Sequence, residues 1–365
     1  MSLSEIIVEK IKKEGPVSFH EFMEMALYYP EYGYYTSAGD KIGKHGDFYT
    51  SPYLTSIFGY MIAKQLEEMW CILDKKSFTI VEYGAGEGRL SNDILTRLKS
   101  NKQLYDKLNY CIIEKSEVMR QKEKMILHDK VQWFNCISDI PLTAGCILSN
   151  EVVDNFPIHQ VIMGNELMEV FVDYNNGFVE TLQPASETLK NYLDELQVTL
   201  PKGFRTEINL QAIEWIKEIA SALKAGFVIT IDYGYPSSAL YNNKRSCGTL
   251  VCYHKHSINY CPYTHIGEQD ITAHVNFSAL RNWGLKNGLG YSGFTTQANF
   301  LLALGLTDYL RTMEQVDTNH ANNAEKTLLI HTFLMDMGSK FKVLIQHKGI
   351  EKPRLSGLQF AQQFV

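Results

Sequence analysis

The sequence predicts an α/β fold with a twisted, mostly parallel sheet that binds its ligand at one edge. First, residues 78–90, FTIVEYGAGEGRL, indicate a buried strand, a glycine turn and the start of a helix. Second, further short apolar runs alternate with helical patterns, at 108–113, 131–137, 146–149 and 227–231. Third, acidic residues follow three of these runs: Glu114, Glu151 and Asp232. Because the carboxyl ends of parallel strands meet at one edge, we expect these acids near the glycine turn.

Helical spacing and capping residues define the remaining elements in chain order. An amphipathic helix at 2–14 ends at Gly15, and Ser18 with Glu21 forms the capping box of a second helix. The helix that follows Glu114 has a strongly charged face. Later elements are a hairpin turn at 175–177, helices at 186–196, 207–223, 276–285, 298–313 and 324–337, and strands at 290–296 and 342–346.

The composition is that of a globular protein and excludes two classes of partner. The 365 residues are 45% hydrophobic with a net charge of -6, which provides no basic field for nucleic acid. No apolar run approaches the length of a membrane span, and residues 1–20 lack the apolar core of a secretory signal. The seven cysteines form no CxxC pair, as expected of reduced thiols. We therefore expect a cytoplasmic bacterial protein, or a mitochondrial matrix protein if a leader was removed.

The glycine turn gives the first indication of a ligand. Its spacing is GxGxG, through Gly84, Gly86 and Gly88, and the third glycine of a dinucleotide-binding loop is replaced by Arg89. An acid, Glu82, stands two residues before the first glycine. This pattern resembles motif I of the S-adenosylmethionine-dependent methyltransferases, whose loop curls under the methionine part of the cofactor. The alternative is a tight strand-to-helix turn without a ligand.

Five separated signatures resemble the MidA-like family of these methyltransferases. They occur in the family's order: GDFYTSP at 46–52, EYGAGEG at 82–88, SNEVVDNFP at 149–157, IDYG at 231–234 and GEQDITAHVNF at 267–277. The family includes the mitochondrial arginine methyltransferase that assists the assembly of respiratory complex I. The resemblance implies S-adenosyl-L-methionine as cofactor and methyl transfer to an arginine of a protein, with symmetric dimethylarginine as product.

The resemblance also implies a domain plan. A class I methyltransferase has a Rossmann-like, seven-stranded, mostly parallel sheet whose last strand is antiparallel. Residues 1–75 are then a helical N-terminal cap that contributes to the cofactor pocket, 76–350 the methyltransferase domain and 351–365 a peripheral tail. Insertions of β-hairpin and loop structure occupy 160–205 and 236–275. The first insertion either shapes the acceptor groove or carries a dimer contact, which leaves a homodimer open.

Several residues become candidate cofactor contacts on the strength of this resemblance. Glu114 accepts hydrogen bonds from the ribose hydroxyls, a geometry that one carboxylate satisfies well, unless it is only a solvated acid. Asp139 meets the adenine, or caps the turn at 142–143. Thr50 and Ser51 close one side of the pocket, or simply start a Ser-Pro helix. The set assigned to the cofactor is Thr50, Ser51, Glu82, Gly84, Gly86, Gly88, Glu114, Asp139 and Asn150.

An arginine acceptor is a planar cation with five donors, so carboxylates suit its binding site. Glu151 is the candidate that grips the guanidinium and aims one nitrogen at the methyl group, because methyl transfer depends on alignment. Asp154 is a second acid, or caps the following turn. His274 is a candidate general base or acceptor contact, and a structural histidine is the alternative. For Glu151 the alternative is a strand-end acid that caps a helix.

Further acceptor contacts fall in the later signatures. Glu207, Asp232, Tyr233, His256 and Asp270 are the assigned set, with capping or turn roles as alternatives for Glu207 and Asp232. The cysteines and histidines at 252–261 contain the right ligand types for a metal, but their CxHxHx4C spacing fits no common zinc site, so no metal is expected.

Two other functions stay open at this stage. A binding or assembly protein that retains the fold without turnover needs neither the glycine loop nor the edge acids. A small-molecule methyltransferase needs both, but methylates a metabolite. The expected partner is a protein that contains the target arginine, such as a respiratory complex I subunit or its homologue.

Overall fold

The computed structural model describes residues 1–39, 41, 43, 46–47, 50–127, 130–141, 144–316, 331–362 and 364. The chain forms two compact units. Unit 1 comprises Met1–Tyr49, Val153–Trp215 and Tyr235–Asn282, and unit 2 comprises Thr50–Val152, Ile216–Gly234 and Trp283–Val365. Each unit is therefore assembled from three separated segments of the chain.

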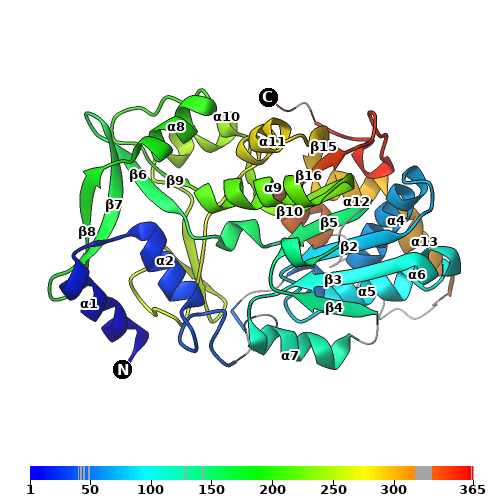
Figure 1. The fold of residues 1–365 in the computed structure, drawn as a ribbon, viewed down its shortest axis with the longest axis horizontal. Helices are drawn as coiled ribbons and strands as arrows, with labels where there is room; N and C mark the ends of the chain where they lie inside the picture. Colours follow the sequence, from blue (N-terminus) through cyan, green and yellow to red (C-terminus); the bar gives the residue numbers. More distant parts are fainter. Residues whose placement is uncertain are drawn as a thin grey trace. The chain divides into compact units, whose positions relative to one another are not determined.

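Unit 2 is built on a mixed sheet whose strands run in the order β15-β16-β10-β5-β2-β3-β4 (Figure 1). The strands are β2 (Phe78–Tyr83), β3 (Leu108–Ile113), β4 (Val131–Phe134), β5 (Ala144–Asn150), β10 (Ala225–Tyr235), β15 (Gly290–Thr296) and β16 (Phe341–Lys348). From β10 to β4 neighbouring strands are parallel, whereas β16 is antiparallel to both β10 and β15. The carboxyl ends of β2, β3, β5 and β10 therefore meet at one edge, as the sequence predicts.

Helices cover this sheet. They are α3 (Ser51–Leu54), α4 (Ile57–Ile72), α5 (Arg89–Leu98), α6 (Lys102–Lys107), α7 (Glu117–Ile126), α12 (Gln297–Ala303), α13 (Leu306–Val316) and α15 (Met337–Lys340), with α9 (Leu210–Ala222) and α11 (Phe277–Lys286) shared with unit 1. Shorter turns are the 3-10 segments η1 (Ile137–Asp139) and η5 (Ser356–Leu358) and the π-helical η4 (His331–Asp336).

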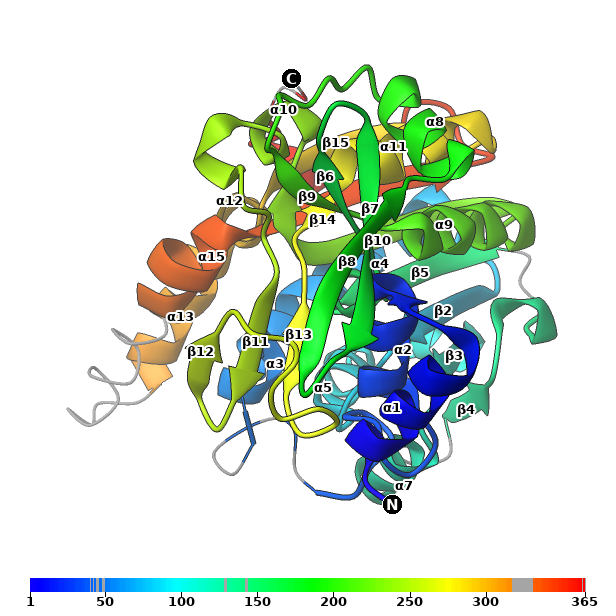
Figure 2. The same ribbon diagram turned by 90° about the vertical axis from the view of Figure 1, so that its left-hand side faces the viewer.

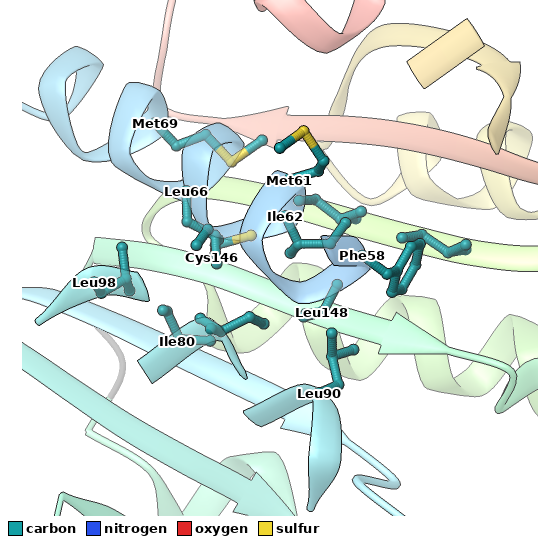
Figure 3. Packing of buried hydrophobic residues seen from close by; sticks show 14 of the residues in the cluster. Phe58, Met61, Ile62, Leu66, Met69, Ile80, Leu90, Leu98, Cys146 and Leu148 are labelled. Atoms are coloured by element: carbon teal, nitrogen blue, oxygen red, sulfur yellow. The ribbon is translucent and has the colours of Figure 1, made fainter. Parts of the chain in front are cut away.

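The core of unit 2 lies between α4, α5 and the sheet. Side chains of α4, among them Phe58, Ile62 and Leu66, pack over β5 at Cys146 and Leu148 (Figure 3). These side chains are almost fully buried, so the removal of each one from water stabilises the folded state by roughly 1.5–3 kcal/mol. Leu90 and Ile94 of α5, the helix that follows the glycine turn, are buried in the same cluster.

Unit 1 combines helices with small antiparallel sheets (Figure 2). Its elements are α1 (Leu3–Glu14), β1 (Val17–Ser18), α2 (Phe19–Tyr28), η2 (Val153–Asn155), β6 (His159–Met163), β7 (Leu167–Tyr174), β8 (Phe178–Pro184), α8 (Glu187–Glu195), β9 (Arg205–Ile208), α10 (Ser237–Leu240), η3 (Asn243–Arg245), β11 (Val251–His254), β12 (Ser257–Asn259), β13 (Asp270–Thr272) and β14 (Val275–Asn276). One sheet runs β1-β7-β6-β9, with β8 paired to β7, and a second runs β12-β11-β13.

Local capping agrees with the sequence. Ser18 accepts a hydrogen bond from the backbone N–H of Glu21 at 3.2 Å and starts α2, and Asn276 does the same for α11 at Ala279. The Asn175–Gly177 turn joins β7 to β8, with Asn176 at φ 54°. In the described part of the chain, no helix is both long and apolar enough to cross a membrane.

Three local expectations change. Glu207, expected at the start of a helix, lies in strand β9, because residues 205–208 pair with β6 and the helix begins only at Leu210. The third strand ends at Phe134, and residues 137–139 form a 3-10 turn instead of its continuation. Of the helix expected at 324–337, residues 331–336 form the π-helical η4 instead, and residues 324–330 lie outside the described residues, as do Phe48 and Tyr49 of the first signature and the turn at 142–143.

Candidate active site

The glycine loop of unit 2 adopts a backbone that favours glycine at each of its three positions. Gly84, Gly86 and Gly88 have φ of 59°, 60° and 80°. The loop is closed by hydrogen bonds from Gly84 N–H to the carbonyl of Ile113 at 3.0 Å and from Gly88 N–H to that of Ala85 at 2.9 Å. It therefore forms a tight turn between β2 and α5 in which all three glycines adopt the left-handed backbone.

The acid before the loop is buried inside unit 2. Glu82 is 2% exposed, and one of its oxygens accepts hydrogen bonds from the hydroxyls of Ser91 in α5 and Tyr110 in β3, both at 2.5 Å. Burial raises the pKa of Glu82, and the two hydroxyls oppose this. Its contacts join the strand, the helix and the neighbouring strand around the loop.

Glu114 stands at the end of β3 and is half-buried. Its Oε1 accepts a hydrogen bond from the backbone N–H of Ser116 at 2.7 Å. Burial raises the pKa of Glu114, while the Ser116 N–H and the Arg120 guanidinium lower it. Asp139, by contrast, is exposed at the end of η1 and accepts a contact from the thiol of Cys136 at 3.0 Å.

The end of β5 turns sharply at Glu151. This residue has φ 56°, a region that costs a non-glycine residue about 1 kcal/mol, and such strain is concentrated at functional sites. Its N–H donates to the carbonyl of Ile231 at 3.0 Å, and its Oε1 accepts from the Asn150 amide at 3.0 Å. The Oδ1 of Asn150 is buried and has no hydrogen-bond partner among the described residues.

Asp232 holds this turn from the neighbouring strand. It is fully buried, and its Oδ2 accepts from the N–H of Val152 at 3.3 Å while its Oδ1 accepts from the N–H of Tyr233 at 2.9 Å. The ring of Tyr233 packs edge-on against Phe341. Asp232 is thus engaged by main-chain donors at the end of β10.

The glycine loop and the Glu151 turn lie against each other. A Cβ atom added at Gly84 would stand 3.1 Å from Cγ2 of Val152, the residue after Glu151. The structure therefore brings together Gly84, Asn150, Glu151 and Asp232 at one edge, as the strand pattern predicts. The buried Oδ1 of Asn150 and the carboxylate of Glu151 therefore stand at the strand end that meets the glycine loop, which is the edge where open α/β sheets bind their ligands.

Thr50 and Ser51 begin α3 in unit 2. Ser51 is fully buried, and its Oγ accepts from the Gln297 amide at 3.2 Å. Thr50 is the residue before the helix, and its side chain makes no capping hydrogen bond. Tyr53 lies further along α3. The guanidinium of Arg89, at the start of α5, stands over its ring, 4.3 Å from the ring centroid. These contacts link α3 to the end of the glycine loop.

Unit 1 gathers a second set of acids. Asp270 is 2% exposed, and its Oδ1 accepts from the Tyr35 hydroxyl at 2.9 Å and the Asn155 amide at 3.1 Å. Burial and the neighbouring Asp154 raise the pKa of Asp270 to about 8. The main-chain carbonyl of Asp154 accepts from Ala273 N–H at 3.0 Å. Two buried carboxyl groups of this kind repel each other, so one of them is favoured in its protonated form.

Glu207 lies elsewhere in unit 1 and is held by Thr249. Its two oxygens accept from the Thr249 N–H, each at 3.0 Å, and Oε2 also accepts from the Thr249 hydroxyl at 2.9 Å. Burial raises the pKa of Glu207, and these donors oppose it. The same Thr249 hydroxyl accepts from His274 N–H at 3.1 Å. Glu207 therefore anchors the segment that leads into β11.

His274 and His256 occupy different places in unit 1. The His274 ring lies 5.4 Å from that of Tyr235, and the Arg245 guanidinium lies 3.7 Å from the centroid of the Tyr235 ring. His256 is exposed in the left-handed turn between β11 and β12, and its N–H donates to the carbonyl of Asp47 at 3.2 Å. No group of three or more His, Cys, Asp or Glu in the described residues is arranged to hold a metal ion.

Sequence reasoning missed several residues that build these clusters. They are Asp47, Tyr35 and Asn155 in unit 1, and Arg120 and Glu123 in unit 2. Asp47 and Asn155 stand inside the first and third signatures, which could have pointed to them, whereas Tyr35 lies before the first signature. Arg120 and Glu123 belong to the charged helix after Glu114, where the spacing gave no sign that one charged residue is buried.

Relatives with assigned names are protein arginine methyltransferases. The chain is 27% identical over 383 residues to the mitochondrial protein arginine methyltransferase NDUFAF7 homologue of Caenorhabditis elegans, across 93% of this chain and 85% of that protein. It is 26% identical over 392 residues to the human NDUFAF7 protein, across 95% and 84% of the two chains.

Two solved structures share the whole fold. A crystal structure from Burkholderia thailandensis, bound to S-adenosyl-homocysteine, matches with a TM-score of 0.89 at 28% identity, over 98% of this chain and 95% of that chain. A native crystal structure from the same organism matches with a TM-score of 0.86 at 28% identity, over 98% and 94%. These matches confirm the expected α/β fold.

A family model described as an S-adenosyl-L-methionine-dependent methyltransferase matches residues 61–295, which is more than half of the chain. The expected resemblance to the MidA-like methyltransferases and the expected cofactor, S-adenosyl-L-methionine, are confirmed together. The chain belongs to this family of S-adenosyl-L-methionine-dependent methyltransferases.

Proposed function

We propose that this protein transfers a methyl group to the guanidinium of an arginine in a protein substrate and forms symmetric dimethylarginine. The observation that carries the proposal is the contact between the glycine loop and the turn at Glu151, where Gly84 and Val152 meet. Val152 directly follows Glu151, so this contact brings a carboxylate suited to a cationic acceptor close to the glycine loop. The relatives in Caenorhabditis elegans and humans are named protein arginine methyltransferases, which supports the arginine acceptor.

In this proposal unit 2 binds the cofactor, which supplies an electrophilic methyl group on its sulfonium. The main chain at Gly84, Gly86 and Gly88 lies against the methionine part, because no Cβ atoms stand in the way. Glu114 accepts hydrogen bonds from the ribose hydroxyls, and Asp139 contacts the adenine. Asn150, Thr50 and Ser51 complete the pocket, and Glu82 stabilises it from below the loop through Ser91 and Tyr110.

Glu151 is the acceptor carboxylate in this proposal. It grips the guanidinium and orients one nitrogen toward the methyl group, which turns a bimolecular encounter into an aligned displacement. Its strained backbone is held by the N–H bond to Ile231, while Asp232 fixes the next residue through Val152 N–H. Asp232 therefore acts through the backbone of the turn, and Tyr233 beside it is an acceptor contact.

Asp154, Asp270, His256, His274 and Glu207 of unit 1 remain proposed acceptor residues. A buried acid pair such as Asp154 and Asp270 suits a cationic side chain, and His274 suits removal of the proton that the guanidinium loses on methylation. The substrate class is an arginine-containing protein such as a respiratory complex I subunit or its homologue. A homodimer and a matrix or cytoplasmic location belong to the same proposal.

The decisive experiment supplies the purified chain with methyl-labelled S-adenosylmethionine and a protein extract, followed by acid hydrolysis and separation of methylarginines. Wild type is expected to label protein arginine, and Glu151→Gln to lose about a hundredfold of that rate because the alignment of the acceptor is lost. S-adenosylhomocysteine affinity is expected to stay unchanged in the variant, since the carboxylate acts on the acceptor.

Glu166→Gln is the matched control, because Glu166 lies exposed in the turn between β6 and β7. Equal labelling by wild type and Glu151→Gln would remove Glu151 from the reaction. Label found only in small molecules would replace the protein acceptor by a metabolite. Cofactor binding without any transfer would favour an assembly protein that retains the fold.

A further inference from the structure

Arg120 joins the ends of two strands of the unit 2 sheet. It lies on α7, which runs beside β4 (Figure 1). Its Nε donates to the main-chain carbonyl of Glu114 at 2.6 Å, at the end of β3. Its Nη2 donates to the carbonyl of Phe134 at 2.8 Å and to Oδ1 of Asn135 at 2.6 Å, at the end of β4. One guanidinium thus binds both strand ends.

The two strand ends carry different parts of the proposed cofactor pocket. Glu114 is the ribose acid, and the segment from Asn135 to Asp139 leads to the adenine residue. Parallel strands separate beyond their last ladder hydrogen bond, so their ends need another link to keep a fixed spacing. A planar guanidinium with a rigid fork of donors supplies such a link, which a lysine cannot copy in full.

Glu123 ties the same helix to the glycine loop. It lies one turn after Arg120 on α7 and is fully buried. Its Oε2 accepts from the Trp133 indole N–H of β4 at 2.6 Å. A Cβ atom at Gly88 would stand 3.4 Å from the Cα of Glu123. The helix that carries Arg120 is therefore fixed against the loop and β4 at once.

Arg120 also sets the charge around the ribose acid. Burial raises the pKa of Glu114, and the positive charge of Arg120 opposes that rise. The other groups that lower the pKa of this carboxyl are the N–H groups of Ser116 and Lys115 and the Lys115 charge. Removing the Arg120 charge leaves burial less opposed, so the pKa of Glu114 rises further.

We propose that Arg120 is a positioning residue of the cofactor site, which sets the spacing and the charge of the ribose-binding and adenine-binding segments. The proposal rests on the proposed role of Glu114. It predicts that Arg120 acts on the adenosine half of the ligand alone. It also predicts that the methyl acceptor is bound independently of Arg120.

The test measures binding of S-adenosylhomocysteine and of adenosine by calorimetry, over a range of pH, for the full chain and its variants. Arg120→Met is expected to weaken both ligands by the same factor, roughly 10- to 100-fold, since three hydrogen bonds from a charged donor are lost. The acidic midpoint of S-adenosylhomocysteine binding is expected to move to higher pH. Arg120→Lys, which keeps the charge, is expected to weaken binding less and to leave the midpoint in place.

Lys102→Met is the charge-matched control, because Lys102 is exposed on α6 of the same unit. It is expected to bind both ligands as wild type does. Arg120→Met with wild-type affinity and wild-type midpoint would overturn the proposal, as would a loss confined to S-adenosylhomocysteine. If Arg120→Met fails to fold, Arg120→Lys decides: undiminished affinity overturns the proposal. Wild type that binds no S-adenosylhomocysteine overturns the cofactor pocket itself and this inference with it.

Discussion

The two units hold their buried acids in different ways. In unit 2 the edge acids are held by main-chain donors at strand ends: Glu114 by Ser116 N–H, and Asp232 by the N–H groups of Tyr233 and Val152. In unit 1 the donors are side chains from distant segments, since Asp270 is held by Tyr35 and Asn155, 235 and 115 residues away. The edge at the glycine loop is therefore held by the main chain of paired strands, whereas the unit 1 cluster depends on side chains of three segments packing together.

This difference decides what each unit tolerates. A strand end and its following turn keep their geometry as long as the sheet is intact, because the ladder fixes the backbone. A cluster of side chains from separate segments loses all its partners when one segment shifts, and each buried acid then stands without donors. Variants in unit 1 are therefore expected to act on stability, and variants in unit 2 on cofactor binding.

The largest expected effect is on stability, from Gly248→Ala in unit 1. Gly248 has φ 84°, and an added Cβ would stand 2.2 Å from Oε1 of the buried Glu207. The substitution strains the backbone and displaces a carboxylate from its donors on Thr249, at a combined cost of about 4 kcal/mol. Urea unfolding measures the loss directly.

Gly203→Ala separates the two contributions in the same unit. Gly203 has φ 85°, but nothing stands within 4 Å of an added Cβ. Only the backbone strain of about 1–2 kcal/mol is then expected. Equal losses in the two variants would show that Glu207 is not a fixed anchor and would remove the contrast drawn between the units.

The part of the fold that follows from local pattern was predictable. The strand, loop and helix at residues 78–98 depend on β-branched residues, glycine spacing and helical periodicity within one short stretch. The meeting of Gly84 with Val152 also follows, because parallel strands present their carboxyl ends together. The expectation of a ligand at this edge therefore follows from the strand pattern, whereas the choice of S-adenosyl-L-methionine depended on the resemblance of the five signatures.

What the sequence did not predict depends on long-range packing. Glu207 resembles a helix start locally, yet pairing with β6 across the hairpin places it in a strand. Glu123 is one of several charged residues on α7, and only the indole of Trp133 and the closeness of the glycine loop make it a buried one. No periodicity distinguishes a charged residue that faces a neighbouring loop from one that faces water.

A second prediction compares one buried acid from each unit. Burial and neighbouring acids raise the pKa of both Glu123 and Asp270 to about 8. The folded state therefore binds more protons than the unfolded state between the ordinary pKa and about 8, so the free energy of unfolding falls as pH rises through that window. Each group contributes about 1.4 kcal/mol per pH unit, or about 3 kcal/mol between about pH 6 and pH 8.

The two amide variants are expected to differ in their effect on stability. Glu123 accepts a hydrogen bond from the Trp133 indole N–H, and the amide oxygen of glutamine can accept the same bond. Glu123→Gln is therefore expected to retain this bond and to remove the contribution of Glu123 to the pH dependence. Asp270 accepts from several donors, so Asp270→Asn turns an NH₂ group toward one of them and loses stability at every pH. Urea unfolding at three pH values checks both. A pH dependence that survives in Glu123→Gln would show that this carboxyl titrates normally.

The smallest expected effect is on stability, from the removal of the N-cap side chain of one helix in each unit. Ser18 caps α2 in unit 1 and Ser116 caps α7 in unit 2, accepting N–H bonds at 3.2 and 3.3 Å. Replacement by alanine is expected to cost about 1 kcal/mol of stability in each case. The affinity for S-adenosylhomocysteine separates them, because α7 carries Arg120 and α2 carries no cofactor residue.

Ser116→Ala is therefore expected to weaken S-adenosylhomocysteine binding by about twofold to fivefold, while Ser18→Ala leaves it unchanged. The loss in Ser116→Ala arises from fraying of the first turn of α7, which shifts the guanidinium of Arg120 from the carbonyls of Glu114 and Phe134. Calorimetry on the two variants gives the answer. An equal loss of affinity in both would mean that overall stability, rather than the position of α7, controls cofactor binding.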